Sequence, residues 1–285
     1  MAFEVKTIGI AGAGTMGQGI AVSCALAGYE TRLFDVNDAA CERAFSLIRK
    51  TLLQLTEKGR ITYNASAEAV KRISIATAPE QLKADLVIEA IAENLELKQN
   101  LFKQVEALNE GKAILATNTS SLSVSNIASA LNNPGQCAGL HFFNPAHIMK
   151  LVEIVAGANT TPDVLSVLKT FAESIGKVSV YAKDSPGFIV NRVARHFYVE
   201  SLLAVEKGAS PEVIDSLMRA SGFKMGPFEL MDLIGIDVNY AVTESVYLGF
   251  NKAPKFKPSP VQKEKIDKGE LGRKSGKGFY AYAQK

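Results

Sequence analysis

Two of the three histidines lie in one short segment, LHFFNPAHIMKLVEI (140–154), together with an acidic residue. His141 is the first of them, and Glu153 follows it by twelve positions. A carboxylate bonded to one imidazole nitrogen fixes the tautomer and stabilises the imidazolium, so the other nitrogen can take a proton from an alcohol. A histidine at a strand end is also often a hydrogen-bonded structural residue, and the spacing leaves both interpretations open. His147 and His196 have only the structural interpretation.

A glycine-rich segment, GAGTMG (12–17), has the G-x-G-x-x-G spacing between a predicted strand and a predicted helix, 18–27. Its glycines allow a tight turn and a close approach of the backbone to a pyrophosphate at the helix N-terminus. Asp35 ends the next predicted strand and would accept hydrogen bonds from a ribose diol. A structural glycine turn is the alternative. We predict a dinucleotide site formed by Gly12, Gly14, Thr15, Met16, Gly17 and Asp35.

The choice of dinucleotide also depends on Asp35. Its charge would repel a 2′-phosphate, and Val36 and Asn37 supply no arginine to receive one. The sequence therefore favours NAD over NADP.

The elements that must position these residues form an α/β pattern. Apolar runs separated by helical stretches predict strands at 6–12, 31–36, 73–77, 85–90, 113–119 and 138–143. Continuous apolar runs are typical of strands buried on both faces of a parallel sheet. We expect a doubly wound, mostly parallel, Rossmann-like sheet, with a further strand-like run, KLVEIVAG, beside the last of these. The connection 38–72 is longer than a crossover needs and predicts an inserted helical hairpin.

The pattern changes in KDSPGFIVNRVARHFYVESLLAVEKG (183–208). Ser185 and Pro186 suit the start of a buried helix that runs to about Val205. Ser210-Pro211 begins another helix, and the stretch 228–250 is helical as well. We predict two domains, a nucleotide-binding domain over 1–185 and an all-helical domain for substrate binding and dimerisation over 186–285.

Composition limits the classes of protein. The 285 residues are 47% hydrophobic and 21% charged, as in globular proteins, and the longest apolar runs are too short to cross a membrane. The N-terminus has no cleavable leader, so we expect a cytoplasmic protein. Nine basic and three acidic residues in 252–284 form a solvated surface or attract an anion, and nucleic acid is not the expected partner. The scattered cysteines indicate neither a disulfide framework nor a metal site: Cys24, Cys41 and Cys137.

A set of ordered motifs extends over nearly the whole chain: GAGTMGQGIA, DLVIEAIAEN, ATNTSSLS, HFFNPAHIMKLVE, SPGFIVNR, GPFELMDLIGID and GELGRKSGKGFY. In order and spacing they resemble the short-chain 3-hydroxyacyl-CoA dehydrogenase family, close to its 3-hydroxybutyryl-CoA dehydrogenases. The resemblance implies that His141 is the general base and Glu153 its partner. It also implies that Ser120 and Asn191 contact the 3-oxygen and thioester region of the substrate; otherwise they would be a turn serine and a helix cap or buried amide.

The same resemblance assigns further binding residues. Glu93 and Lys98 would contact the nicotinamide half of NAD, with Asn118 as another cofactor neighbour; a capping acid and a solvated lysine are the alternative. Thr51 and Lys58 would contact coenzyme A from the helical hairpin, although a solvated helix face is the alternative there. The resemblance implies a homodimer formed through the helical domain.

The expected function is the reversible, NAD-dependent oxidation of a (3S)-3-hydroxyacyl-CoA, with 3-hydroxybutyryl-CoA as the leading substrate. The stretches VARHFYVES and DLIGIDVNYAV also resemble the 3-hydroxyadipyl-CoA branch of phenylacetate degradation. In that branch Arg195 could bind a distal carboxylate of the substrate. The alternative interpretation is a surface or interface arginine. Two other classes stay open: a non-catalytic NAD-binding structural or sensor protein, and a lysine-dependent dehydrogenase of free hydroxy acids.

Overall fold

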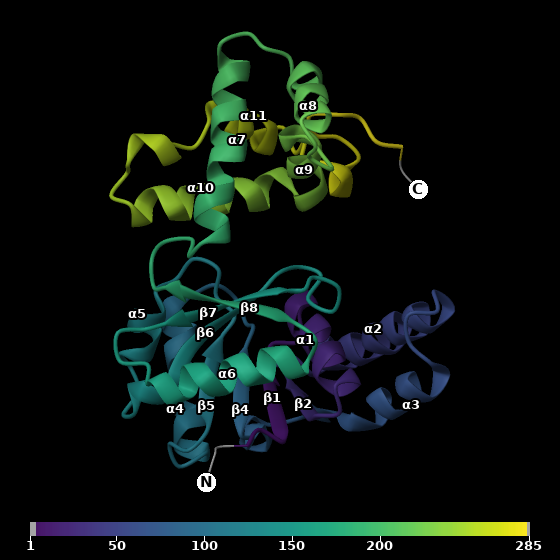
Figure 1. The fold of residues 1–285 in the computed structure, drawn as a ribbon, viewed down its shortest axis with the longest axis vertical. Coiled ribbons are helices and arrows are strands. Elements are labelled where there is room, and N and C mark those ends of the chain that lie inside the picture. Colours follow the sequence, from purple (N-terminus) through teal and green to yellow (C-terminus); the bar gives the residue numbers. More distant parts are fainter. Residues whose placement is uncertain (1–3, 284–285) are drawn as a thin grey trace. The chain divides into compact units, whose positions relative to one another are not determined.

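The computed structural model describes residues 4–283, and the chain divides into two compact units between Asp184 and Ser185. In the first unit the described residues form an eight-stranded sheet (Figure 1). Its strands are β1 (Thr7–Ala11), β2 (Glu30–Phe34), β3 (Ile73–Ala76), β4 (Leu86–Glu89), β5 (Ile114–Thr117), β6 (Cys137–Phe142), β7 (Leu151–Ala156) and β8 (Val178–Lys183).

The strand order is β3-β2-β1-β4-β5-β6-β7-β8. The strands from β3 to β6 pair in parallel, β7 runs antiparallel to β6, and β8 is parallel to β7. The predicted mostly parallel, doubly wound sheet is confirmed. The sequence prediction omitted β8, whose residues VSVYAK are largely exposed or half-buried at the sheet edge and give no continuous apolar run.

Helices cover both faces of this sheet. One core joins the strands to α1 (Thr15–Leu26), α2 (Asp38–Glu57), α3 (Tyr63–Arg72) and α6 (Pro162–Ser174), with Ile20, Leu52 and Phe171 among its buried side chains. The other core includes Phe102 and Ile127, from α4 (Leu95–Leu108) and α5 (Val124–Ala128). The sheet is thus buried on both sides, as its apolar runs predicted.

The helical connection expected over 38–72 is present as α2 and α3. Asn37 caps α2 by accepting the Ala40 N–H at 3.2 Å, and Thr62 caps α3 by accepting the Ala65 N–H at 3.1 Å. Side-chain caps satisfy amide donors that a helix start leaves without partners.

The second unit is helical, as predicted for the C-terminal region. Tyr198, Leu202, Phe228, Met231 and Ile236 form its core. Its helices are α7 (Val190–Glu206), α8 (Pro211–Ala220), α9 (Pro227–Ile234), α10 (Ile236–Gly249) and α11 (Pro260–Asp267). Short 3-10 turns in the two units are η1 (Pro79–Leu82), η2 (Pro134–Gln136), η3 (Pro254–Phe256) and η4 (Arg273–Ser275).

The start of α7 was predicted too early. Ser185 and Pro186 precede a turn in which Gly187 and Phe188 have φ values of 73° and 47°. This left-handed conformation is incompatible with an α-helix, so the helix begins only after it. The exposed Val193 also shows that α7 is buried on one face rather than all round.

Two buried carboxylates organise the loops of the second unit. Asp215 accepts the N–H groups of Phe228 and Glu229 at 3.0 and 2.9 Å, at the start of α9. Asp232 accepts the N–H groups of Phe279 and Tyr280, both at 2.9 Å. A Cβ added to Gly278 would lie 2.0 Å from Asp232 Oδ1, so only glycine allows this approach. The motifs GPFELMD and GKGFY are therefore two parts of one structural contact.

Within residues 4–283, no helix is both long and apolar enough to cross a membrane. In the same range no group of three or more His, Cys, Asp or Glu side chains is placed to hold a metal ion. The three cysteines are buried and unpaired: Cys24, Cys41 and Cys137.

Candidate active site

The glycine loop connects β1 to α1 at the carboxyl edge of the sheet. A Cβ at Gly17 would lie 1.8 Å from the Gly12 carbonyl oxygen, so the helix can approach the strand only with glycine there. A Cβ at Gly14 would meet no heavy atom within 4 Å in the described part of the chain. The loop is therefore tightly packed on its inner side and open on its outer side, where a pyrophosphate needs room.

The helix N-terminus beside this loop is prepared for an anion. Among the described residues no side chain caps α1, and its first turn holds no acidic residue. Amide groups of the first turn are consequently available to a bound anion. Thr15 is exposed at this end, and Met16 is half-buried against the core.

Asp35 follows β2 and stands next to the loop. Its carboxylate accepts the Ala13 N–H at 2.9 Å and the Asn37 N–H at 3.1 Å. It also lines a cavity of about 520 Å³ that includes Gly12 and Gly14. The other walls of this cavity are mainly apolar, with Phe34, Val36, Ile91, Leu97 and Leu101. A phosphate-binding turn, a carboxylate for a ribose and an apolar wall for a base fit the adenosine half of NAD.

His141 and Glu153 occupy paired positions of the only antiparallel ladder among the described strands. They are register partners on β6 and β7, and Nδ1 of His141 lies 2.7 Å from Oε2 of Glu153. His141 is 5% exposed and Glu153 is fully buried. The predicted pairing of imidazole and carboxylate is confirmed. Parallel order from β1 to β6 places His141 near the same carboxyl edge as the glycine loop.

Ser120 belongs to a loop after β5 that one carboxylate gathers together. Glu93 accepts the N–H groups of Ser120 and Ser121 at 3.1 and 3.3 Å, and the Ser121 hydroxyl at 2.9 Å. The Thr119 hydroxyl donates to the same oxygen. Glu93 therefore fixes the main chain at Ser120. It is not the helix cap of the alternative interpretation, since Asn94 caps α4.

Lys98 is not a solvated lysine. Its side chain is 1% exposed, and its ammonium lies 2.5 Å from Glu89 Oε1 and 3.1 Å from Glu93 Oε2. Burial alone would raise the pKa of Glu93, but the Lys98 charge and the Thr119 hydroxyl outweigh it and the pKa lies below its usual value.

Glu89 was missed as a site residue in the sequence analysis. It is the last residue of β4, fully buried, and it binds Lys98. The sequence contained a signal for it. An acidic residue inside the apolar run DLVIEA is expected to be a buried charge if the run forms a strand, and buried acidic residues are rare unless they are paired.

Asn118 ties two strand ends together. Its side-chain oxygen accepts the Phe142 N–H at 2.8 Å, which connects the end of β5 to β6 beside His141. The structure thus brings Asn118, Ser120, Glu93 and His141 to one edge of the sheet.

The residues predicted to bind coenzyme A are separated along α2. Thr51 lines a cavity of about 130 Å³ with Gln18, Asn144 and His147. Burial, with a smaller effect of Lys177, lowers the pKa of His147. Lys58 is the exposed C-cap of α2, about 10 Å further along the helix. It does not line the Thr51 cavity.

In the second unit, Asn191 is half-buried in the first turn of α7. Arg195, one turn later, is buried, and its guanidinium donates to the Asn239 carbonyl at 3.0 Å and to the Thr243 hydroxyl at 2.9 Å. Burial lowers its pKa to about 10. The interpretation of Arg195 as a surface arginine is wrong, because it links α7 to α10.

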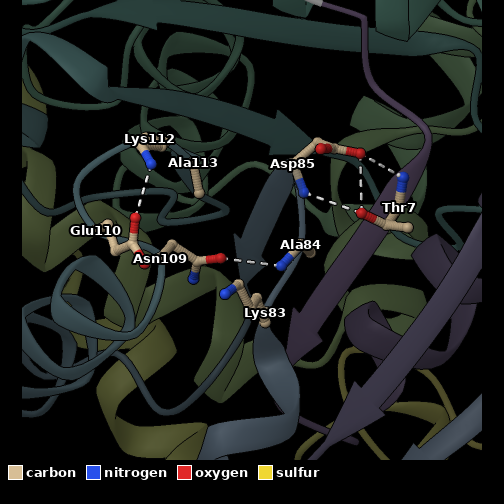
Figure 2. Close-up of a pocket in the computed structure, with 8 residues that line it drawn as sticks. All are labelled: Thr7, Lys83, Ala84, Asp85, Asn109, Glu110, Lys112 and Ala113. Carbon is tan, nitrogen blue, oxygen red and sulfur yellow. Dashed lines mark hydrogen bonds and ion pairs between the residues drawn. The ribbon is translucent and has the colours of Figure 1, made fainter.

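A depression at the opposite, amino edge of the sheet has a different character. Figure 2 shows Asp85 held by Thr7, and Asn109 accepting the Ala84 N–H at 3.0 Å. The depression measures about 270 Å³ and includes the exposed Lys112–Glu110 pair. Half-buried Thr7 and Asp85 bind each other and buried Asn109 binds Ala84, so we assign the candidate site to the carboxyl edge.

A Rossmann-like sheet with a glycine loop and a buried His–Glu pair at its carboxyl edge defines a nucleotide-dependent oxidoreductase. The sequence profile of the 3-hydroxyacyl-CoA dehydrogenase NAD binding domain matches residues 7–185. That of the 3-hydroxyacyl-CoA dehydrogenase C-terminal domain matches residues 187–282. The chain belongs to the 3-hydroxyacyl-CoA dehydrogenase family, and the resemblance and the NAD cofactor predicted from the sequence are confirmed.

Individual relatives carry different substrate names. A 3-hydroxyadipyl-CoA dehydrogenase of Escherichia coli (strain K12) is 46% identical over 283 residues; the match covers 98% of this chain and 60% of that protein. A "Probable 3-hydroxybutyryl-CoA dehydrogenase" of Bacillus subtilis (strain 168) is 40% identical, with 99% of both chains covered. The crystal structure of (S)-3-hydroxybutyryl-CoA dehydrogenase from Ralstonia eutropha has a TM-score of 0.94 and 37% identity, covering 99% of this chain and 100% of that one.

Proposed function

We propose that this protein catalyses the reversible, NAD-dependent oxidation of a (3S)-3-hydroxyacyl-CoA to a 3-oxoacyl-CoA, with His141 as general base. The observation that carries this proposal is the 2.7 Å contact between His141 Nδ1 and Glu153 Oε2 in a buried strand pair. A structural or sensor protein that only bound NAD would gain nothing from an imidazole oriented in this way.

The roles of the two residues follow from their positions. Because Glu153 holds Nδ1, proton transfer belongs to Nε2 of His141. Nε2 takes the proton of the 3-hydroxyl during oxidation, and Glu153 stabilises the imidazolium that results. In the reverse direction the imidazolium returns the proton to the 3-oxo group. When bound, NAD accepts the hydride that leaves C3.

The remaining residues bind and orient. Ser120 is proposed to donate a hydrogen bond to the reacting oxygen, on which charge develops. Asn191 and Lys58 keep their substrate and coenzyme A roles as predictions of the family resemblance, and Thr51 lines a cavity consistent with its own role. The glycine loop and Asp35 are proposed to hold the adenosine diphosphate part of NAD, with Asn118, Glu93 and Lys98 around its nicotinamide half.

The leading substrate is 3-hydroxybutyryl-CoA, and 3-hydroxyadipyl-CoA is the alternative. The alternative is supported by the 46% identity to the Escherichia coli 3-hydroxyadipyl-CoA dehydrogenase. It would need a cation for the distal carboxylate, but Arg195 is engaged with Asn239 and Thr243 inside the helical unit. Comparison of kcat/KM for the two thioesters decides between them.

The mechanism is tested by His141→Gln. Glutamine keeps a hydrogen-bonding side chain but cannot accept and return the proton. We expect turnover of acetoacetyl-CoA and NADH to fall by orders of magnitude, roughly 10²-fold or more. Calorimetric NAD affinity should stay within about threefold, because the glycine loop and Asp35 are unchanged. Near-normal turnover in this variant would rule out His141 as the acid/base.

We also propose a homodimer formed through the helical unit and a cytoplasmic location. Large apolar side chains of this unit are 50–66% exposed, and a second copy would cover them: Val193, Val213, Leu217 and Phe223. Sedimentation at micromolar concentration tests the dimer.

The proposed cytoplasmic location is supported by the cysteines. All three are buried and unpaired, which a reducing compartment favours.

A further inference from the structure

Glu89 is a buried carboxylate for which the proposed reaction gives no direct role. We propose that Glu89 is a positioning residue for Ser120, acting through Lys98 and Glu93. This inference rests on the proposed function, because it concerns the placement of a residue that binds the reacting oxygen. It is carried by a continuous series of contacts within the first unit.

The first link fixes the carboxylate itself. Glu89 Oε1 accepts the Ile91 N–H at 2.8 Å and binds the Lys98 ammonium at 2.5 Å. Its other oxygen accepts the Thr117 hydroxyl at 2.7 Å, across the β4–β5 pair. Both oxygens are therefore engaged, and the side chain has one orientation. A carboxylate held in this way restricts the positions of the side chains that bind it.

The second link places the cation. Lys98 is 1% exposed and reaches two carboxylates, fully buried Glu89 and 38% exposed Glu93. Glu93 stands at the surface and has water as an alternative partner. Lys98 reduces that freedom by binding Glu93 Oε2, while Oε1 receives the loop donors. The ammonium can hold Glu93 at this place because Glu89 anchors it from the buried side.

The third link reaches Ser120. Glu93 Oε1 accepts the N–H groups of Ser120 and Ser121 as well as the hydroxyls of Thr119 and Ser121. Two hydrogen bonds to consecutive amides fix the direction of the chain at Ser120. The position of the Ser120 side chain thus depends on Glu93, and through Lys98 on Glu89.

Loss of the Glu89 charge should release this arrangement. Glu89 and Glu93 share one ammonium, so the group carries a net charge of about −1 when all three are ionised. Without Glu89, Lys98 keeps Glu93 as its remaining carboxylate and loses its buried anchor. Glu93 is then drawn off the loop, and Ser120 moves with it.

The test compares Glu89→Gln with the matched control Glu106→Gln. Glu106 is also a buried glutamate of the first unit, but its carboxylate binds Asn132 and the Asn133 N–H. We expect Glu89→Gln to lower kcat for acetoacetyl-CoA reduction on the order of 10- to 100-fold. Glu106→Gln should lose thermal stability but keep kcat within about twofold.

Equal kcat values in the two variants, at equal folded fractions, would overturn the inference while the proposed function stands. A wild-type protein that consumes no NADH with 3-oxoacyl-CoA substrates would overturn the proposed function, and the inference with it.

A second variant, Lys98→Met, adds a pH readout that a purely structural role would not change. Lys98 lowers the pKa of Glu93, so its removal should raise that pKa. As the pH falls, Glu93 then becomes protonated earlier and releases the loop. In the direction of reduction, where His141 must be protonated, the acid limb of the kcat profile should move to higher pH than in the wild type. An unmoved limb contradicts the proposed link through Lys98.

Discussion

Buried carboxylates occur in both units, but their partners differ. Glu89 and Glu153 of the first unit bind Lys98 and His141, side chains that carry or acquire a proton. Asp215 and Asp232 of the second unit bind main-chain N–H groups and tyrosine hydroxyls. A carboxylate bound to an ionisable side chain can support a change of charge during turnover. A carboxylate bound to amides fixes the path of the chain.

The partner, rather than the unit, makes this difference. Glu106 lies in the first unit, and it binds the Asn133 N–H together with the main chain and side chain of Asn132, as a loop-fixing group would. Removal of a carboxylate of the first kind should therefore change catalysis more than stability. Removal of one of the second kind should do the reverse.

The largest effect is expected for Glu153→Gln. The amide has nearly the same shape but cannot stabilise an imidazolium, so kcat should fall on the order of 10²- to 10⁴-fold. Stopped-flow measurement of NADH consumption and a melting curve on the same preparation give both quantities. A loss of stability with unchanged kcat would place Glu153 in the chain-fixing class and contradict the comparison.

Asp232→Asn should have a smaller effect than Glu153→Gln, and it should lower stability rather than kcat. Asn presents N–H groups to donors that previously met a carboxylate, and a buried donor without an acceptor costs about 1–3 kcal/mol. We expect the free energy of unfolding of the second unit to fall by about 3 kcal/mol in denaturant titrations. Asp237→Asn is the control, since its exposed ion pair with Lys274 should contribute less than about 1 kcal/mol.

The smallest effect is expected at Asp85, because its carboxylate binds main-chain amides but is only half-buried. Burial alone would raise the pKa of Asp85, but the N–H groups of Lys6 and Thr7 and the Thr7 hydroxyl outweigh it, so the pKa lies below its usual value. The unfolded chain then binds the proton more readily than the folded protein. The stabilisation is present above the unfolded-state pKa and is lost as the pH falls through the folded one.

Asp85→Asn should accordingly cost about 1 kcal/mol at neutral pH. The difference from the wild type should shrink below about pH 4, where the carboxyl becomes protonated. Urea unfolding at a series of pH values measures this trend. A difference that stays constant down to pH 2 would show that the charge of Asp85 contributes nothing.

Much of the fold could be predicted because its signals are local. Continuous apolar runs, a glycine loop and N-cap residues each depend on a few neighbouring positions. The prediction of the helices α2 and α3 depended on local positions as well. The pairing of His141 with Glu153 was accessible for a related reason, since the two residues lie on consecutive strands twelve positions apart.

What could not be predicted depends on distant contacts. Glu89 meets Thr117 because β4 and β5 are neighbours, and Glu93 meets Ser120 in the loops that follow these two strands. The edge strand β8 has no apolar signal of its own. The destination of the Arg195 guanidinium depends on how α10 packs against α7. Such contacts follow from the assembled sheet and helices, not from residue spacing.

The antiparallel ladder between β6 and β7 has a consequence for the evolution of the site. Main-chain pairing of β6 with β7 holds His141 opposite Glu153. In the segment 144–149 that connects the two strands, Ala146 is buried in the core, while Asn144 and His147 line the cavity of Thr51. Selection can vary the side chains that line this cavity while the strand pairing keeps the His141–Glu153 pair in place. The side chains that line this cavity and the His141–Glu153 pair are in this sense separate modules of one strand pair.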